Sequence, residues 1–285
     1  MRSVTATRAI EGGKRGSSRP IVVETEAGAC IVKLRGAAQG TGPLIAEIIV
    51  GAVADAMGLS VPARMLVKLQ PSMNVPERDA ELRDLMGASV GMNLGFAYLD
   101  GARDFVLTEI DKVSAADRAA IFWLDRFVMN PDRNARNTNL LWHEHKLWLI
   151  DHGASLGFQY DWSTVTEASP TRQFVETEPH LFAASLSTND VAVADEKFVK
   201  IITRELLERA VAEVPDGFIL PLLGGDEDLV SVSEALRRRR AAYSTFLWKR
   251  ISGARTFADP RAMPAPRVRT GPPAWVRKEI GRAHV

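Results

Sequence analysis

Apolar and polar residues alternate in short runs near the start of the chain, which is the pattern of β-strands. We predict strands over residues 4–10, 20–24, 28–34 and 64–69. Residues 25–28 read as a hairpin turn between the second and third of these strands. A glycine-rich loop, residues 12–18, joins the first two. The chain is therefore expected to begin with an antiparallel sheet.

Helical spacing of apolar residues interrupts this sheet once and dominates the second half of the chain. The helix predicted over residues 44–57 carries its apolar stripe at Leu44, Ile48, Ala52 and Ala56. Gly58 then ends the helix, as glycine commonly does. Further helices are predicted from Ser114, at a capping motif, to Asn130, and over residues 191–214 and 231–251.

Two more segments read as strands, and one gives no clear pattern. Residues 105–110 alternate well enough for a strand, and residues 138–150 read as a hairpin. Residues 71–104 contain several glycines and show neither the alternation of a strand nor the apolar spacing of a helix. Strands followed mainly by helices indicate an α+β fold.

Composition narrows the class of protein. The chain has 285 residues, 46% hydrophobic and 25% charged, with a formal net charge of +1, which is ordinary for a soluble globular protein. The charge balance gives no support to nucleic-acid binding through the core. Cys30 is the single cysteine, so neither an internal disulfide nor a cysteine-rich zinc site is expected, and we predict a reducing, cytoplasmic location. No segment is apolar and long enough to predict a membrane span.

The most informative segment lies between residues 130 and 153. Asp132 and Asn137 are spaced D-x4-N just after a predicted helix, and Asp151 follows the predicted hairpin. The hairpin would fold back and bring Asp151 near Asn137. Phosphoryl transfer needs such a set: one carboxylate for the attacking hydroxyl, and an amide and a second carboxylate for magnesium. Taken alone, D-x4-N is also compatible with a turn that hydrogen-bonds to its own backbone.

Upstream residues fit the same chemistry. Lys33 lies in the third predicted strand, where it can neutralise nucleotide phosphates, and Glu47 lies in the next helix, where it can orient Lys33 by an ion pair. Ser17 and Ser18 belong to the glycine-rich loop, whose amides and hydroxyls can bind phosphate. The alternatives are a solvated strand lysine, a surface glutamate and a plain flexible connection.

These motifs resemble those of the HipA-like kinase family, within the wider protein-kinase-like and phosphoinositide-kinase-like fold. The similar segments are residues 132–137 (DRNARN), 149–153 (LIDHG) and 46–62, the helix and turn after the lysine strand. The resemblance covers about residues 1–250. It implies a bilobal fold: an N-terminal sheet lobe over residues 1–110, a mainly helical lobe over residues 111–252, and a tail over residues 253–285.

The resemblance also implies roles for single residues. Asp132 would be the catalytic base, Asn137 and Asp151 would bind Mg²⁺, and Lys33 would contact the α- and β-phosphates of ATP. The strand at 105–110 would enter the hinge, with the backbone of Glu109 and Ile110 facing adenine.

Two departures from ordinary protein kinases leave the acceptor open. His152 replaces the usual aromatic residue after the metal aspartate, and Asn134 lacks the positive charge often found two residues after the base. A Ser/Thr hydroxyl of a protein is the first expectation. A small-molecule, inositol or lipid hydroxyl is the second, and a non-catalytic nucleotide-binding scaffold is the third.

The tail has its own composition. Residues 253–285 carry seven Lys/Arg, two acidic residues and five prolines, which predicts an extension that is disordered or ordered only by docking. Its charge suits an acidic surface, phosphate or nucleic acid as partner, while a solvated extension is the default interpretation of this composition.

Overall fold

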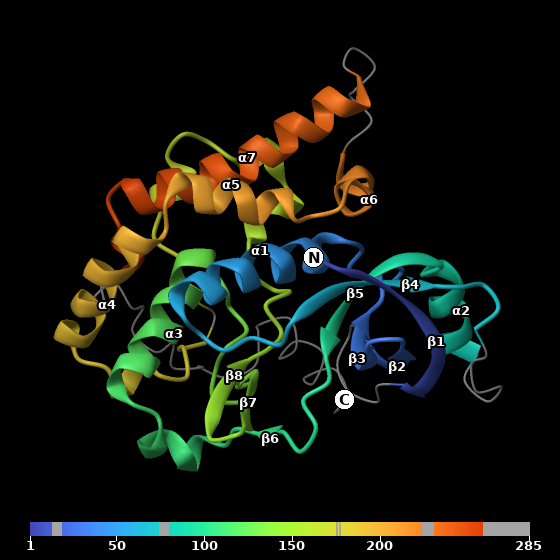
Figure 1. Ribbon diagram of the computed structural model, residues 1–285. Coiled ribbons are helices and arrows are strands. Elements are labelled where there is room, and N and C mark those ends of the chain that lie inside the picture. Colours follow the sequence, from blue (N-terminus) through green and yellow to red (C-terminus); the bar gives the residue numbers. More distant parts are fainter. Residues whose placement is uncertain (13–18, 74–79, 175, 177, 224–230, 259–285) are drawn as a thin grey trace, which may run out of the picture.

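Five strands close into a barrel in the order β1-β2-β3-β5-β4 (Figure 1). They are β1 (Ser3–Gly12), β2 (Ile21–Thr25), β3 (Gly28–Lys33), β4 (Arg64–Leu69) and β5 (Gly91–Ala97). The computed structural model describes residues 1–12, 19–73, 80–174, 176, 178–223 and 231–258. The first four strands confirm the strands predicted from the alternating pattern.

The pairing of the strands differs from the prediction at one place. Four pairs are antiparallel, as expected, but β1 runs parallel to β4, with Ser3 opposite Leu66. The expectation of a purely antiparallel sheet is wrong there, because a long crossover separates β1 from β4 and the parallel pair closes the barrel. Every second residue points into the barrel and is at most 5% exposed: Val4, Ile21, Val23, Cys30, Val32, Met65 and Val67.

Helix α1 (Gly42–Met57) connects the barrel to the helical part of the molecule. It is buried on nearly all sides, and its apolar residues belong to the core of the helical part rather than to the barrel interior. Gly58 ends the helix with a φ of 80°, in the left-handed region that glycine adopts without strain. The helical part therefore fixes the position of α1 and of Glu47 on it.

The rest of the chain is mainly helical, with one small sheet (Figure 1). The helices are α2 (Ala80–Ala88), which packs on the barrel, α3 (Ala115–Val128), α4 (Thr188–Ile201), α5 (Arg204–Ala212), α6 (Asp216–Ile219) and α7 (Val232–Ser252). The small sheet is β6 (Arg103–Asp104), β7 (Leu140–His143) and β8 (Lys146–Leu149). The pair β7–β8 confirms the predicted hairpin, which positions Asp151 just beyond its end.

The strand predicted over residues 105–110 is wrong. Pairing with β7 ends at Asp104, and the chain continues into a 3₁₀ helix, Leu107–Lys112. Of the apolar residues in this segment Phe105 is fully buried and Ile110 packs partly buried against the core, while Val106 is 48% exposed. The alternation was thus too short to bury one face of a strand.

The other departures concern missed or merged elements. Residues 191–214 form two helices rather than one, because Ile202 is buried at a break and Thr203 caps the start of α5. Helix α2 and strand β5 lie in the segment that gave no clear pattern. Within the described residues, no helix is both long and apolar enough to cross a bilayer.

The start of the predicted tail is docked on the helical part. Residues Thr256–Ala258 form a 3₁₀ helix, and the Phe257 ring packs against Trp123 and Phe127 of α3. Phe257 is 1% exposed. The remaining tail, residues 259–285, lies outside the described residues.

Gly95 gives a test of the packing inside the barrel. A Cβ at this position would lie 2.4 Å from Val67 Cγ2 and 3.3 Å from Met65 Cγ. We expect Gly95→Ala to lower the free energy of unfolding by about 1–3 kcal/mol through overpacking. Gly87→Ala on α2 is the control, since a Cβ there meets no atom within 4 Å and alanine favours helix. Denaturant unfolding measures both, and equal effects of the two changes would contradict the prediction.

Candidate active site

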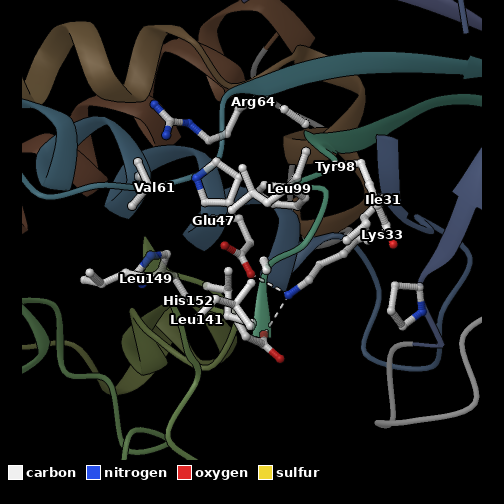
Figure 2. Close-up of a pocket in the computed structure, with 18 residues that line it drawn as sticks. Ile31, Lys33, Glu47, Val61, Arg64, Tyr98, Leu99, Leu141, Leu149 and His152 are labelled. Carbon is white, nitrogen blue, oxygen red and sulfur yellow. Dashed lines mark hydrogen bonds and ion pairs between the residues drawn. The ribbon is translucent and has the colours of Figure 1, made fainter. Parts of the chain in front are cut away.

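The centre of the site is the ammonium group of Lys33 at the end of β3. Its Nζ lies 2.5 Å from Glu47 Oε1 and 2.6 Å from Asp151 Oδ1 (Figure 2). Glu47 comes from α1, and Asp151 follows β8, so three elements distant in sequence meet at one cation. The prediction that Glu47 pairs with Lys33 is confirmed, and the alternative of a surface glutamate is wrong, since Glu47 is 1% exposed.

The charges of this cluster stabilise one another. Burial alone would lower the pKa of the Lys33 ammonium, but Glu47 and Asp151 outweigh it and raise the pKa above its usual value. Burial alone would raise the pKa of Asp151, but the charge and hydrogen bond of Lys33 hold it below its usual value. Lys33 and Asp151 are therefore both ionised at neutral pH.

A cavity of about 320 Å³ opens on one side of this cluster (Figure 2). Its walls are mostly apolar and come from the barrel, from the turn before β4 and from β7–β8: Ile31, Val61, Phe96, Leu99, Leu141 and Leu149. Tyr98, Leu99 and Ala102, in the segment that leads from β5 to β6, form one rim. A cavity of this volume with apolar walls suits a flat aromatic group.

A second cavity, of about 760 Å³, lies on the other side of Lys33 and shares Lys33 and Asp151 with the first. Asp132 and Asn137 line it, together with the loop 37–40 and Tyr160. A molecule spanning both cavities would place its apolar end in the first and its polar end near the carboxylates in the second.

The D-x4-N segment folds so that its two ends meet. Asn137 Nδ2 donates to Asp132 Oδ2 at 2.9 Å, and Asn139 Nδ2 donates to the Asp132 carbonyl at 3.1 Å. The Asp132 amide is held by Asn130 Oδ1 at 3.0 Å. The structure thus brings together Lys33, Asp132, Asn137 and Asp151, which the sequence predicted as one site.

Asp151, Asn137 and Asp132 line the same cavity, and carboxylate and amide oxygen atoms are the ligands that Mg²⁺ prefers. Within the described residues, no cluster of three or more His, Cys, Asp or Glu side chains could hold a metal alone. This donor set fits magnesium of the kinase type, which takes few protein ligands and completes its shell with phosphate and water oxygens.

His152 directly follows Asp151 in the chain and is 2% exposed. Burial lowers the pKa of His152 to about 4, so the ring is neutral at neutral pH. The guanidinium of Arg133 faces its Nδ1 at 3.4 Å. Sequence reasoning missed Arg133, although its place next to Asp132 in the D-R pair was a signal.

The remaining predicted site residues do not join this cluster. Glu109 and Ile110 are absent from the described lining of both cavities, and Glu109 pairs with Arg103 and Lys112 instead. The strand that pairs with β3 is β5, so the rim that Glu109 and Ile110 were expected to form comes from residues 98–102. Ser17 and Ser18 lie outside the described residues.

Comparison with known proteins agrees with this geometry. The family model described as HipA-like kinase matches residues 7–221. The chain belongs to the HipA-like kinase family. The matched range contains the four site residues from Lys33 to Asp151, and it confirms the resemblance seen in the motifs.

The fold of this HipA-like kinase also has a counterpart among solved structures. The crystal structure of the Helicobacter pylori proinflammatory kinase CtkA superposes with a TM-score of 0.57 at 14% sequence identity, covering 88% of this chain and 94% of that chain. At this identity the likeness shows a shared fold. No curated protein matches the chain.

The ion-pair cluster gives a test that does not depend on activity. Lys33→Met would leave the buried Glu47 carboxylate facing Asp151 without a cation, so we expect it to lower the free energy of unfolding by about 3 kcal/mol. Glu47→Gln should then lower the free energy of unfolding less in the Lys33→Met background than in wild type, because Glu47 has already lost its Lys33 partner.

Lys68→Met is the matched control for this cycle, since Lys68 is an exposed lysine on β4. Its effect should stay within about 0.5 kcal/mol. Denaturant unfolding of all four variants measures the cycle. An additive cycle, or an equal effect of the two lysine variants, would contradict the coupling.

Proposed function

We propose that this HipA-like kinase uses ATP and Mg²⁺ and transfers the γ-phosphoryl group to a Ser/Thr hydroxyl of a protein. The observation that carries the proposal is the Lys33 cluster, which joins an apolar cavity to one lined by Asp132 and Asn137. A nucleotide needs that combination: a flat base on one side, a cation at its phosphates, and a carboxylate where the acceptor arrives.

Each residue then has a role that its contacts support. Lys33, oriented by Glu47, neutralises the α- and β-phosphates. Asp151 and Asn137 would hold Mg²⁺, which would offset the negative charge of the phosphates. Asp132 accepts the proton of the attacking hydroxyl as the new O–P bond forms, while the bond between the γ-phosphorus and the bridging oxygen breaks and ADP leaves. The adenine lies in the cavity of about 320 Å³, against the backbone of residues 98–102.

The charge of the larger cavity favours a protein hydroxyl over a phosphorylated headgroup. Among the described residues that line it, Lys33 is the one Lys or Arg, and both Glu47 and Asp151 already pair with it. An inositol lipid carrying several phosphates would need further cations there. An uncharged Ser or Thr side chain does not.

The role of Asp132 is tested by Asp132→Ala. We expect phosphoryl transfer from labelled ATP, with the protein alone and with cell lysate, to fall about a thousandfold, while ATP affinity stays within about twofold. Asp84→Ala on α2, an exposed aspartate remote from both cavities, is the control and should behave as wild type. If wild type binds ATP and labels neither itself nor any lysate component, the chain acts as a nucleotide-binding scaffold instead.

The role of Asp151 is tested by titrating ATP with and without Mg²⁺. We expect Mg²⁺ to tighten ATP binding to the wild type. In Asp151→Ala the factor by which Mg²⁺ raises the ATP affinity should be about ten- to a hundredfold smaller, because the carboxylate ligand is missing. Calorimetry measures the affinities, and Asp84→Ala again serves as control. Undiminished Mg²⁺ dependence in Asp151→Ala would contradict the metal assignment.

A further inference from the structure

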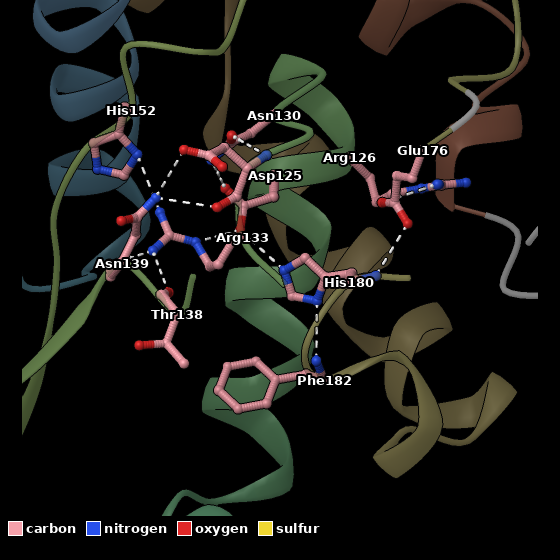
Figure 3. A network of polar contacts seen from close by, with 11 residues as sticks. Asp125, Arg126, Asn130, Arg133, Thr138, Asn139, His152, Glu176, His180 and Phe182 are labelled. Atoms are coloured by element: carbon pink, nitrogen blue, oxygen red, sulfur yellow. Dashed lines mark hydrogen bonds and ion pairs between the residues drawn. The ribbon is translucent and has the colours of Figure 1, made fainter. Parts of the chain in front are cut away.

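A fully buried carboxylate lies beneath residues 130–139, the segment that carries Asp132 and Asn137 and is called the catalytic loop below after the role proposed for Asp132. Asp125, in α3, is 0% exposed and accepts three hydrogen bonds (Figure 3). Asn130 Nδ2 donates at 2.9 Å, Arg133 Nε at 2.6 Å, and His180 Nε2 lies at 3.0 Å. Burial alone would raise the pKa of Asp125, but Arg133 and His180 outweigh it and hold the pKa well below its usual range. The carboxylate therefore stays charged and depends on its donors.

Two of these donors also hydrogen-bond to the catalytic loop, Asn130 at Asp132 and Arg133 at the end of the loop. Asn130 Oδ1 accepts a hydrogen bond from the Asp132 amide. Arg133 donates to the carbonyls of Thr138 and Asn139, the two residues that follow Asn137.

Arg133 also faces the segment behind the metal aspartate, since its Nη2 lies 3.4 Å from His152 Nδ1. Asp132 is thus linked to the buried carboxylate by two hydrogen bonds through Asn130, and the residues that directly follow Asn137 and Asp151 are linked to it through Arg133.

The third donor comes from a distant segment. His180 lies 29 positions after Asp151 in the sequence and is 4% exposed. The Phe182 amide donates to its Nδ1 at 3.1 Å, so Nδ1 carries the lone pair and Nε2 carries the proton that points at Asp125. The Leu181 amide donates to the Arg133 carbonyl at 3.2 Å, which docks this segment on the catalytic loop itself.

We propose that His180 is a positioning residue of the phosphotransfer site, whose Nε2–H completes the set of donors around Asp125. The catalytic loop then takes its reactive geometry only while residues 178–182 are docked against it. Removing this donor leaves a buried carboxylate lone pair unsatisfied, and Asp125 shifts together with Asn130 and Arg133. The proposal rests on the proposed role of Asp132.

Two variants, each keeping one hydrogen-bonding position of the His180 ring, separate this role from plain core packing. In His180→Gln, the side-chain amide places an N–H near the position of Nε2, so the donor to Asp125 is kept. In His180→Asn, the side-chain oxygen lies near the position of Nδ1, so the contact with the Phe182 amide is kept and the donor is lost. Both variants remove the ring from Phe122, whose centroid lies 5.2 Å away. Asparagine is one methylene shorter than glutamine, so the unfolding midpoints of both variants are measured to separate lost packing from the lost donor.

We expect kcat of His180→Asn to fall about 10- to 100-fold, and that of His180→Gln to fall less than about threefold. KM for ATP should stay within about twofold in both, because His180 lines neither described cavity. Equal losses in both variants, or a loss that follows only their unfolding midpoints, would show that His180 is a packing residue.

Amide hydrogen exchange over residues 131–139 gives a readout independent of activity. We expect exchange there to quicken in His180→Asn and to stay near wild type in His180→Gln, while β2 and β3 remain unchanged in both. Unchanged exchange in His180→Asn would overturn the coupling. If wild type transfers no phosphoryl group, the proposed function fails, but the exchange experiment still decides whether His180 positions the loop.

Discussion

The ammonium group of Lys33 is the interaction on which the site depends, because it joins parts of the molecule that have separate cores. The barrel contributes Lys33, while Glu47 belongs to a helix buried in the helical part and Asp151 follows the small sheet. Glu47 is buried, so moving the barrel away would leave its charge without a cation, which is costly. The ion pairs therefore hold the cavity walls in register, while the Asp151 carboxylate, unlike that of Glu47, remains accessible to a ligand that brings its own cation.

The helical part secures the catalytic loop with a buried cation of a different kind. Arg250, in α7, donates to four backbone carbonyls: those of Arg126, Phe127, Pro170 and Arg172. Burial, helped by the nearby charge of Arg126, lowers the pKa of Arg250 to about 9. Two of the four carbonyls lie in the last turn of α3, just before the catalytic loop. Helix α7 thus fixes the end of α3 while the Asp125 carboxylate fixes the loop that follows.

The sequence predicted the residues whose chemistry is carried by local spacing, and missed those defined by tertiary packing. Lys33, Asp132, Asn137 and Asp151 each belong to a short motif, so they were found. Strand β5 was missed because its glycines imitate a turn, and it takes the close approach of Val67 in the folded barrel to explain Gly95. Asp125 and His180 are 55 residues apart and lie in no shared motif. On a helix, an aspartate like Asp125 reads as solvent-facing until its donors are known.

The two departures from ordinary protein kinases, Asn134 and His152, both serve the folding of the catalytic loop. Asn134 Oδ1 accepts the amides of Arg136 and Asn137 at 2.9 and 3.1 Å, a side-chain turn that aims Asn137 back at Asp132. A cationic side chain offers no such acceptor. His152 offers its Nδ1 to Arg133, and an aromatic hydrocarbon ring there would leave that buried guanidinium a donor without a partner. The hydrogen bonds of this loop thus account for the identity of both residues, without reference to the substrate that accepts the phosphoryl group.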